Sequence, residues 1–335
     1  MRFSIRLNND LPVRDYVRLA QAAEAVGFDQ FWVSHDLFLQ SAPVILTAIA
    51  AATERIALGT CVLNPYTMHP AEIAMTAATL DEYSGGRFLL GLAAGAADFL
   101  GWVGIAQETP LGTLRTAVTQ IRAVLAGEPV PGWQPEAYLR MPAPPNRHIP
   151  IYLGAASPRM LRFVGEVADG ALPLMFAPER YPQVAGLISE GIVRAGRTAA
   201  DVDLAACLWV SASPDRAAAE AVLADKVAYY GHAMSPLIWD FLGVSQADFA
   251  PIAHALQTAR DPAKARALVT PQMLRIGVAG TGADLIARLE PMVTAGAMHL
   301  SFGPPLGPDP LAAITELGRT VLPHFREKQR RLWSR

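Results

Sequence analysis

The feature that most constrains the fold is an alternation of short apolar segments with helical segments along most of the chain. Each apolar segment ends in glycine or a small polar residue, and an amphipathic helical segment follows it. The apolar segments are Arg2–Leu7, Gln30–Ser34, Ile56–Leu63, Phe88–Ala93, Ile151–Gly154 and Ala171–Met175. Nearly continuous apolar strands separated by helices predict parallel strands buried on both faces, the pattern of an α/β protein.

Two further apolar segments, Val202–Ser211 and Met298–Phe302, bring the predicted strands to eight. The predicted helices are Val13–Val26, Pro43–Thr53, Pro70–Tyr83, Pro110–Ala126, Pro158–Ala168, Pro178–Ala195, Ala283–Ala295 and Leu311–Leu322. Eight strands with these helices favour a (β/α)8 TIM barrel over an open doubly wound sheet. An open sheet would more often show G-x-G-x-x-G after its first strand, where this chain has Leu7-Asn8-Asn9-Asp10.

Two segments interrupt the alternation. Residues 127–150 are rich in proline and lack a helical period, which predicts an excursion or a hairpin before strand five. Residues 214–268 are helical, rich in alanine and too long for one crossover, which predicts an inserted helical element before the last strand. We therefore expect a single barrel domain over residues 1–335.

Composition excludes several classes of function. A net charge of −2 gives no basic patch for nucleic acid, and no apolar stretch reaches the roughly 18 residues that span a bilayer. Met1–Asn8 predicts a strand and lacks the features of a signal peptide, so we expect a soluble, cytoplasmic protein. The histidines are scattered without metal-ligand spacing, so no metal site is expected. Cys61 and Cys207 are expected to be buried thiols, although a disulfide is possible.

The second predicted strand ends in Ser34-His35-Asp36, which places an imidazole beside a carboxylate. Active sites of barrels form at the carboxyl ends of the strands, so His35 and Asp36 are candidate catalytic residues for proton transfer or for hydrogen bonding to a polar ring. Adjacent residues on a strand point in opposite directions. The alternative is therefore a helix-capping aspartate beside a partly exposed histidine.

Three other strand ends carry candidate binding residues. Strand three leads to Asn64, where an ordinary turn is the alternative. Strand four leads into small residues around Gly95, which leave room for a flat ligand, although tight barrel packing produces the same composition. Strand five leads into Ala155-Ala156-Ser157, where amides, a hydroxyl and a helix start form an anion site suited to phosphate. A simple helix cap by Ser157 is the alternative.

Short segments spread over almost the whole chain form a set that is specific as a whole. They are AAEAVGFDQFW (22–32), TERIALG (53–59), NPYTMHP (64–70), TLDEYSGGRFLLG (79–91), IPIYLGAASP (149–158), ADG (168–170), GTGAD (280–284) and FGPPLGPDP (302–310). In this order the set resembles the bacterial luciferase-like superfamily, and specifically its branch of coenzyme F420-dependent reductases. The methylenetetrahydromethanopterin reductases have the most similar pattern.

The resemblance implies a barrel that binds coenzyme F420 or, as the alternative, FMN, with the ring system at the carboxyl ends of the strands. It implies that the cofactor phosphate lies on Ala155, Ala156 and Ser157. It also implies a non-prolyl cis peptide in strand three, here at Cys61–Val62, beneath the ring. By position, the resemblance makes Thr60, Cys61, Val62 and Asn64 cofactor contacts.

The chain departs from the methylenetetrahydromethanopterin reductases at three positions. Arg6 stands where they carry a glutamate in strand one, and Ala96 where they carry an aspartate after strand four. After strand two they have Asp-His, and this chain has His35-Asp36. Arg6 suggests an anionic or electron-rich group on the substrate, or a different charge partner. Trp102 and Phe176 follow strands four and six and are candidate pocket residues, with rim packing as the alternative.

The function that we expect is hydride transfer from F420H2 to a small organic acceptor such as an imine, an enone or a pterin-like ring. The first alternative is an FMN-dependent monooxygenase. A deazaflavin lacks the ring nitrogen that supports reaction with oxygen, so the identity of the cofactor separates these two functions. The second alternative is a non-catalytic flavin-binding protein. The expected partners are a small-molecule substrate and further copies of this chain, in a homodimer or a higher homo-oligomer.

Overall fold

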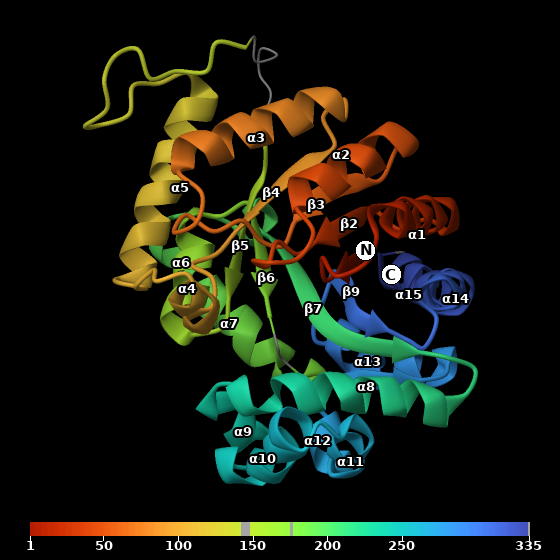
Figure 1. The fold of residues 1–335 in the computed structure, drawn as a ribbon. Coiled ribbons are helices and arrows are strands. Elements are labelled where there is room, and N and C mark those ends of the chain that lie inside the picture. Colours follow the sequence, from red (N-terminus) through yellow and green to blue (C-terminus); the bar gives the residue numbers. More distant parts are fainter. Residues whose placement is uncertain (142–147, 175–176, 334–335) are drawn as a thin grey trace.

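The computed structural model describes residues 1–141, 148–174 and 177–333, which fold into a parallel β-barrel surrounded by helices (Figure 1). Eight strands close the ring in the order β1-β2-β3-β4-β5-β6-β7-β9, and β9 returns to pair with β1. They are β1 Arg2–Leu7, β2 Gln30–Val33, β3 Ala57–Thr60, β4 Phe88–Leu92, β5 Ile151–Ala155, β6 Gly170–Pro173, β7 Asp203–Ala212 and β9 His299–Leu306. The predicted TIM barrel is confirmed.

One further strand lies outside the ring. β8 Val278–Gly280 pairs in parallel with Val210–Ala212, the last residues of β7. β8 was not predicted, because three residues are too few to show the apolar alternation of a strand.

The helices that follow the strands cover the outside of the ring, and their apolar faces form the main core with the outward-facing strand residues. They are α1 Val13–Val26, α2 Ala42–Ala52, α3 Pro70–Tyr83, α4 Ala97–Trp102, α5 Pro110–Ala126, α6 Pro158–Val167, α7 Tyr181–Arg194, α13 Gly282–Thr294, α14 Pro310–Glu316 and α15 Leu322–Trp333. The predicted bounds of α1, α3 and α5 are correct. The short α4 was not predicted, because six residues give too little periodicity.

The predicted helical insertion is also confirmed. Between β7 and the last strand lie α8 Arg216–Tyr230, α9 Pro236–Leu242, α10 Gln246–Ala253, α11 Pro262–Ala267 and α12 Pro271–Leu274. In Figure 1, α9 to α12 cluster beside α8. A second hydrophobic core holds them there, formed by Leu223 and Val227 of α8 with Ile238, Phe249 and Met273. In the proline-rich segment, residues 127–141 and 148–150 form no helix or strand.

Large side chains fill the barrel interior, and glycines on neighbouring strands make space for them. A Cβ atom on Gly59 would lie 2.1 Å from the Trp32 ring, and one on Gly170 would lie 2.0 Å from the Tyr152 ring. Real atoms do not approach this closely, so only glycine fits at these two positions. The interior is therefore a packed core, as is usual in such barrels.

A buried polar network closes the amino-terminal end of the barrel. The Asp203 carboxylate is 3.0 Å from His299 Nδ1 and 3.0 Å from the Arg2 guanidinium, and it accepts a hydrogen bond of 2.8 Å from the Tyr152 hydroxyl. His299 Nε2 is 2.9 Å from Ser4 Oγ. This serine, histidine and aspartate join three strands, and Ser4 and His299 are completely buried and therefore closed to any substrate.

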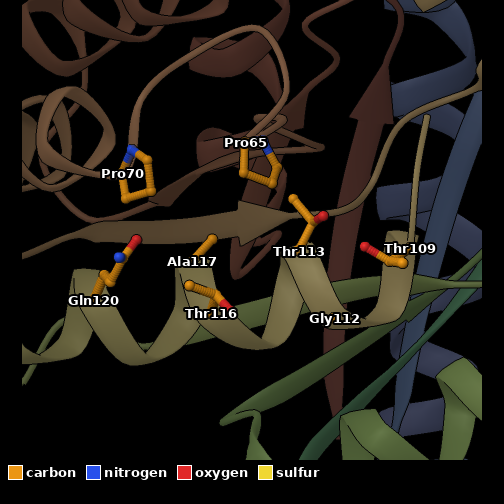
Figure 2. Close-up of a pocket in the computed structure, with 8 residues that line it drawn as sticks. All are labelled: Pro65, Pro70, Thr109, Gly112, Thr113, Thr116, Ala117 and Gln120. Atoms are coloured by element: carbon orange, nitrogen blue, oxygen red, sulfur yellow. The ribbon is translucent and has the colours of Figure 1, made fainter. Parts of the chain in front are cut away.

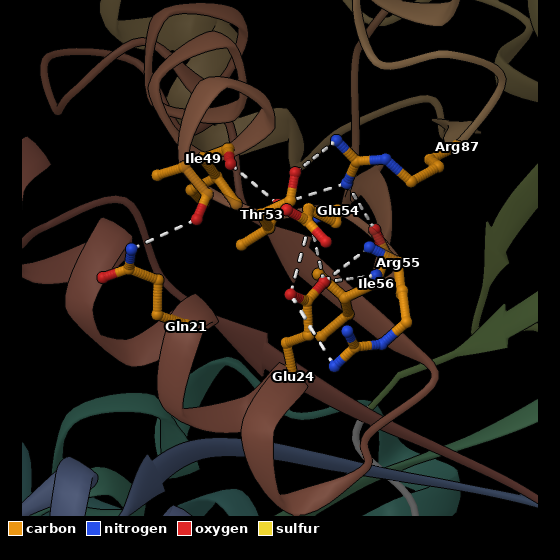
Figure 3. Close-up of polar contacts among 9 residues, drawn as sticks. Gln21, Glu24, Ile49, Thr53, Glu54, Arg55, Ile56 and Arg87 are labelled. Carbon is orange, nitrogen blue, oxygen red and sulfur yellow. Dashed lines mark hydrogen bonds and ion pairs between the residues drawn. The ribbon is translucent and has the colours of Figure 1, made fainter.

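A second polar cluster, shown in Figure 3, ties the segment before β3 to its neighbours. The Glu24 carboxylate on α1 accepts hydrogen bonds from the amides of Glu54, Arg55 and Ile56, at 3.1, 2.6 and 2.8 Å. Arg87 immediately precedes β4, and its guanidinium donates to the carbonyls of Ala50, Thr53 and Ile56 at 2.8–3.0 Å. Both side chains lie at the amino-terminal end of the barrel, where residues usually stabilise the fold and take no part in catalysis.

We expect Glu24→Ala to lower the free energy of unfolding by about 2 kcal/mol, because three amides lose a charged acceptor. Burial raises the pKa of Glu24, but hydrogen bonds from Ile56, Arg55 and Glu54 outweigh it and lower the pKa overall. The contribution is therefore present above pH about 4 and is lost as the pH falls further. Urea denaturation at pH 7 and pH 3 measures both effects. Glu54→Ala, which removes an exposed neighbour, is the control, and equal stability of the two variants would contradict the prediction.

Candidate functional site

The predicted site residues that the structure describes lie around the carboxyl-terminal mouth of the barrel, opposite the polar network of Asp203. The side of the mouth under β3, β4 and β5 carries little side-chain bulk. A Cβ atom on Gly154 would lie 3.1 Å from Ala93 Cβ and 3.5 Å from Val62 Cγ1, so these three residues adjoin. Together Val62, Ala93 and Gly154 form a surface of small side chains, which we call the small-residue floor.

The end of β3 has the geometry that the family resemblance implied. The Cys61–Val62 peptide is cis, as predicted, and beyond it Leu63 bridges to Leu92 of β4. The Thr60 hydroxyl exchanges 3.0 Å hydrogen bonds with the backbone N–H and C=O of Gly91. Thr60 is completely buried, so its side chain joins β3 to β4, whereas Val62 is partly exposed. That these residues contact a cofactor stays a prediction.

Both cysteines are free and buried, which confirms the expectation of two thiols. Burial raises the pKa of Cys61 to about 12. Burial also raises the pKa of Cys207. At neutral pH both side chains are protonated, so neither is a thiolate nucleophile.

Asn64 and Gly95 are brought together after β3 and β4. Asn64 Oδ1 accepts a 2.8 Å hydrogen bond from the Tyr66 amide, and its Nδ2 lies 2.0 Å from where a Cβ atom of Gly95 would be. Gly95 has a φ of +78°, and Gln107 donates to its carbonyl at 2.9 Å. Only glycine fits here, both for its backbone conformation and for the space.

The predicted anion site lies at the junction of β5 and α6. Ala155 is buried at the end of β5, whereas Ala156 and Ser157 are exposed to the mouth. Ser157 Oγ accepts a 3.3 Å hydrogen bond from the Met160 amide, so the serine is the N-cap of α6. Among the described residues, the Ala156 and Ser157 amides donate no backbone hydrogen bond. The cap and the anion site are therefore compatible, and the anion site stays a prediction.

His35 and Asp36 point to different surroundings, as expected for neighbouring residues. His35 Nδ1 accepts a 3.1 Å hydrogen bond from the Ala42 amide at the start of α2, and burial lowers the pKa of His35. The backbone of Asp36 is fixed by Asn9, which donates to its carbonyl at 3.0 Å. Burial raises the pKa of Asp36, Lys226 opposes this, and the charge of Asp10 adds to it. The side chain that accepts a hydrogen bond at the start of α2 is thus His35 and not Asp36.

Arg6 lies inside the barrel below the mouth and is 5% exposed. Its Nη2 donates a long 3.4 Å hydrogen bond to the Leu208 carbonyl, and its Nε has no hydrogen-bond partner among the described residues. A Cβ atom on Gly303 would lie 2.1 Å from Nη2, so glycine makes space for the guanidinium. No ion pair of Arg6 is present in the part of the chain that the structure describes.

Lys226 of α8 also lies at the mouth, where no residue of this helix was predicted. Its ammonium lies 4.3 Å from the Tyr230 ring centre and 5.5 Å from the Trp209 ring centre, and 3.5 Å from Asn8 Oδ1. Burial is the main cause that lowers the pKa of Lys226 to about 8, and the charge of Arg6 adds to it. One lysine on an alanine-rich helix carries no sequence signal of its position at the mouth.

Trp102 is at the rim of the mouth and is 64% exposed. Its ring centre lies 4.7 Å from that of Phe99 and 6.4 Å from that of Phe38, which is itself exposed. The other predicted pocket aromatic, Phe176, lies outside the described residues. An aromatic rim beside the mouth suits an apolar ligand, and rim packing is present as well.

A pocket of about 490 Å3 lies outside the barrel, between the start of α3 and one face of α5 (Figure 2). It is lined by Pro65, Pro70, Thr109, Gly112, Thr113, Thr116, Ala117 and Gln120. Because none of these side chains titrates or carries charge, the pocket offers no acid, base or nucleophile.

Within the described ranges, no group of three or more histidine, cysteine, aspartate or glutamate residues is arranged to hold a metal ion. In the same ranges, no helix combines the length and apolarity that a membrane crossing requires.

Comparisons with known proteins agree with this geometry. Residues 1–299 match the model of the luciferase-like monooxygenase family. The chain is 32% identical to the 5,10-methylenetetrahydromethanopterin reductase of Methanolobus tindarius, over 96% of this chain and 100% of the relative. It is 30% identical to the enzyme of the same name from Archaeoglobus fulgidus, over 97% and 100%. The solved coenzyme F420-dependent tetrahydromethanopterin reductase of Methanopyrus kandleri superposes with a TM-score of 0.87 at 28% identity, covering 97% of this chain and 99% of that one.

Proposed function

Because this chain belongs to the luciferase-like monooxygenase family, we propose that it is an oxidoreductase that transfers hydride between coenzyme F420 and a small organic acceptor. The observation that carries this function is the similarity over the full length to F420-dependent reductases, whereas solved monooxygenases of this fold are more distant. The small-residue floor and the Ala155–Ser157 turn support the proposal, since they suit a flat ring and an anion.

The residues at the mouth fit this cofactor. The exposed Ala156 and Ser157 amides, at the start of α6, would hold its phosphate, and Val62, Ala93 and Gly154 would support its ring. When bound, the deazaflavin supplies the hydride. The chain would position the acceptor against the ring, beside the rim formed by Phe38 and Trp102.

Proton transfer in this proposal falls to Asp36 rather than to His35. The His35 Nδ1 atom is engaged at the start of α2, whereas Asp36 is near Lys226 and its pKa is raised, first by burial. A carboxyl group with a raised pKa holds a proton closer to neutral pH and is suited to general acid–base chemistry. A homodimer or higher homo-oligomer and a cytoplasmic location stay predictions, and gel filtration tests the first.

Titration of the purified protein with oxidised F420 and with FMN, followed by fluorescence, tests the proposed cofactor. We expect F420 to bind at least tenfold more tightly than FMN, which corresponds to about 1.4 kcal/mol. Tight binding of FMN without affinity for F420 would instead indicate the monooxygenase. Binding of F420 without turnover of any imine or enone acceptor would indicate a non-catalytic protein.

A further inference from the structure

Two cationic side chains at one side of the mouth lack an ion-pair partner among the described residues. Arg6 is buried, and its Nε has no hydrogen-bond partner among these residues, while the Lys226 ammonium lies near Asn8 and two aromatic rings. Removal of a cation from water costs several kcal/mol unless an anion compensates it. The buried Arg6 guanidinium is therefore unfavourable until a negative charge arrives, and the partly buried Lys226 ammonium adds a second positive charge.

Strand register places the two cations on the same side. Gly303, which makes space for Arg6, pairs with Trp209 in the β7–β9 ladder. The Lys226 ammonium lies over the Trp209 ring. The two charges are near enough for Arg6 to disfavour the protonated form of Lys226. Arg6 and Lys226 thus face one region, bounded by Trp209 and Gly303, which we call the cationic pocket wall.

The cofactor phosphate is not the anion for this wall. In a ring of eight strands in the order given above, β1 and β5 are four strands apart, on opposite sides of the barrel. The proposed phosphate position follows β5, whereas Arg6 is on β1 and Lys226 follows β7. A phosphate on the Ala156 and Ser157 amides leaves the two cations without a counterion.

We propose that the substrate carries an anionic group, a carboxylate or a phosphate, that binds between Arg6 and Lys226. This inference rests on the proposed function, because it assigns the anionic group to the substrate of that enzyme. The binding of the anion itself needs no cofactor. A guanidinium with a free donor suits either anion, and the ammonium adds a second positive charge. The charges of Asp10 and Asp36 also act on the ammonium and raise its pKa, against the effects of burial and Arg6.

The experiment is a thermal-shift titration of the full chain without cofactor, at constant ionic strength. The probes are acetate, inorganic phosphate and uncharged acetamide, which has nearly the shape of acetate. A ligand that binds the native state raises Tm with concentration. We expect acetate, phosphate or both to raise Tm at concentrations at least tenfold lower than acetamide requires, and the stronger of the two anions identifies the group.

Three variants assign the effect to the wall. We expect Arg6→Met and Lys226→Met to weaken the apparent affinity for the anion at least tenfold and to leave the response to acetamide unchanged. Lys264→Met, which removes an exposed lysine of α11, is the matched control and should behave as the parent protein. Without any anion, Arg6→Met should raise Tm, because it removes an uncompensated buried cation. A purely structural arginine would give a lower Tm.

The affinity of the cationic pocket wall for an anion should decrease as the pH rises. Asn8 and Asp10 after β1, Asp36 after β2, Tyr230 of α8 and Arg6 surround Lys226. Since the pKa of Lys226 is lowered to about 8, anion binding should weaken between pH 7 and pH 9, and Lys226→Arg should remove this dependence. Equal responses to acetate, phosphate and acetamide, or unchanged anion affinity in both methionine variants, would overturn the proposal. Failure of F420 to bind would instead contradict only the proposed function.

Discussion

Asp203→Asn is expected to lower the free energy of unfolding by about 2–3 kcal/mol, the effect of removing a charged acceptor from a mostly buried hydrogen-bond network. Asp203 joins Arg2, His299 and Tyr152 at the amino-terminal end of the barrel, with distances of 2.8–3.0 Å. Asparagine has nearly the same shape as aspartate. The loss of stability therefore comes from the missing negative charge and from the donors that no longer have a charged acceptor. Urea denaturation measures the change.

At low pH, the difference in the free energy of unfolding between the parent protein and Asp203→Asn should disappear. Burial alone would raise the pKa of Asp203, but His299, Arg2 and the Tyr152 hydroxyl outweigh it and hold the pKa well below its usual range. A carboxyl group with a lowered pKa stabilises the fold above its unfolded pKa of about 4, and this stabilisation is lost as the pH falls toward the folded value.

The control is Asp240→Asn, which changes an exposed aspartate of α9. It should leave stability within about 0.5 kcal/mol of the parent, as surface substitutions usually do. The Asp203 network lies at the end of the barrel away from the mouth, so the folded fraction of Asp203→Asn should bind F420 normally. A variant as stable as the control would show that the network contributes little.

Ser157→Asp is expected to weaken F420 binding by about tenfold to a hundredfold. Aspartate is as good an N-cap as serine, so α6 should still begin at the same residue. The new carboxylate would lie beside the proposed phosphate, and two negative charges about 5 Å apart repel by about 3 kcal/mol at an effective dielectric constant of 20, less with salt screening.

Ser157→Asn separates charge from capping. Asparagine caps a helix as well as aspartate but has no charge, so this variant should bind F420 within a few-fold of the parent. Fluorescence titration of all three proteins at low and moderate salt gives the comparison, and the defect of the aspartate variant should shrink as salt rises. Equal affinities of the two variants would place the phosphate elsewhere.

The alternation of apolar and helical segments was sufficient to predict the barrel, because hydrophobic periodicity is a local property of the chain. Pro70 and Ser84, at the two ends of α3, show how local chemistry also sets boundaries. Short elements escaped the same reasoning: α4 and β8 have too few residues for a period to emerge. The cis peptide at Cys61–Val62 came from the family resemblance, since periodicity contains no information on it.

The site was only partly accessible from the sequence. The strand ends indicated where His35, Asp36 and Ser157 would lie, but the environment of each depended on partners distant along the chain. The His35 ring accepts a hydrogen bond at the start of α2, and the Thr60 hydroxyl donates one to Gly91 of β4. Lys226 had no sequence signal, although it is close to Asn8, 218 positions away.

Local patterns in the sequence were enough to predict which segments are strands and helices, and hence that the candidate site lies at one end of a barrel. The folded structure was needed to show that Arg6 and Lys226 lie on one side of the mouth, and that His299 joins Asp203 to Ser4. The physical reason is that element type follows from contacts between near neighbours, whereas the meeting of side chains follows from ring closure and strand register. Both depend on packing between segments hundreds of residues apart, which no local pattern encodes.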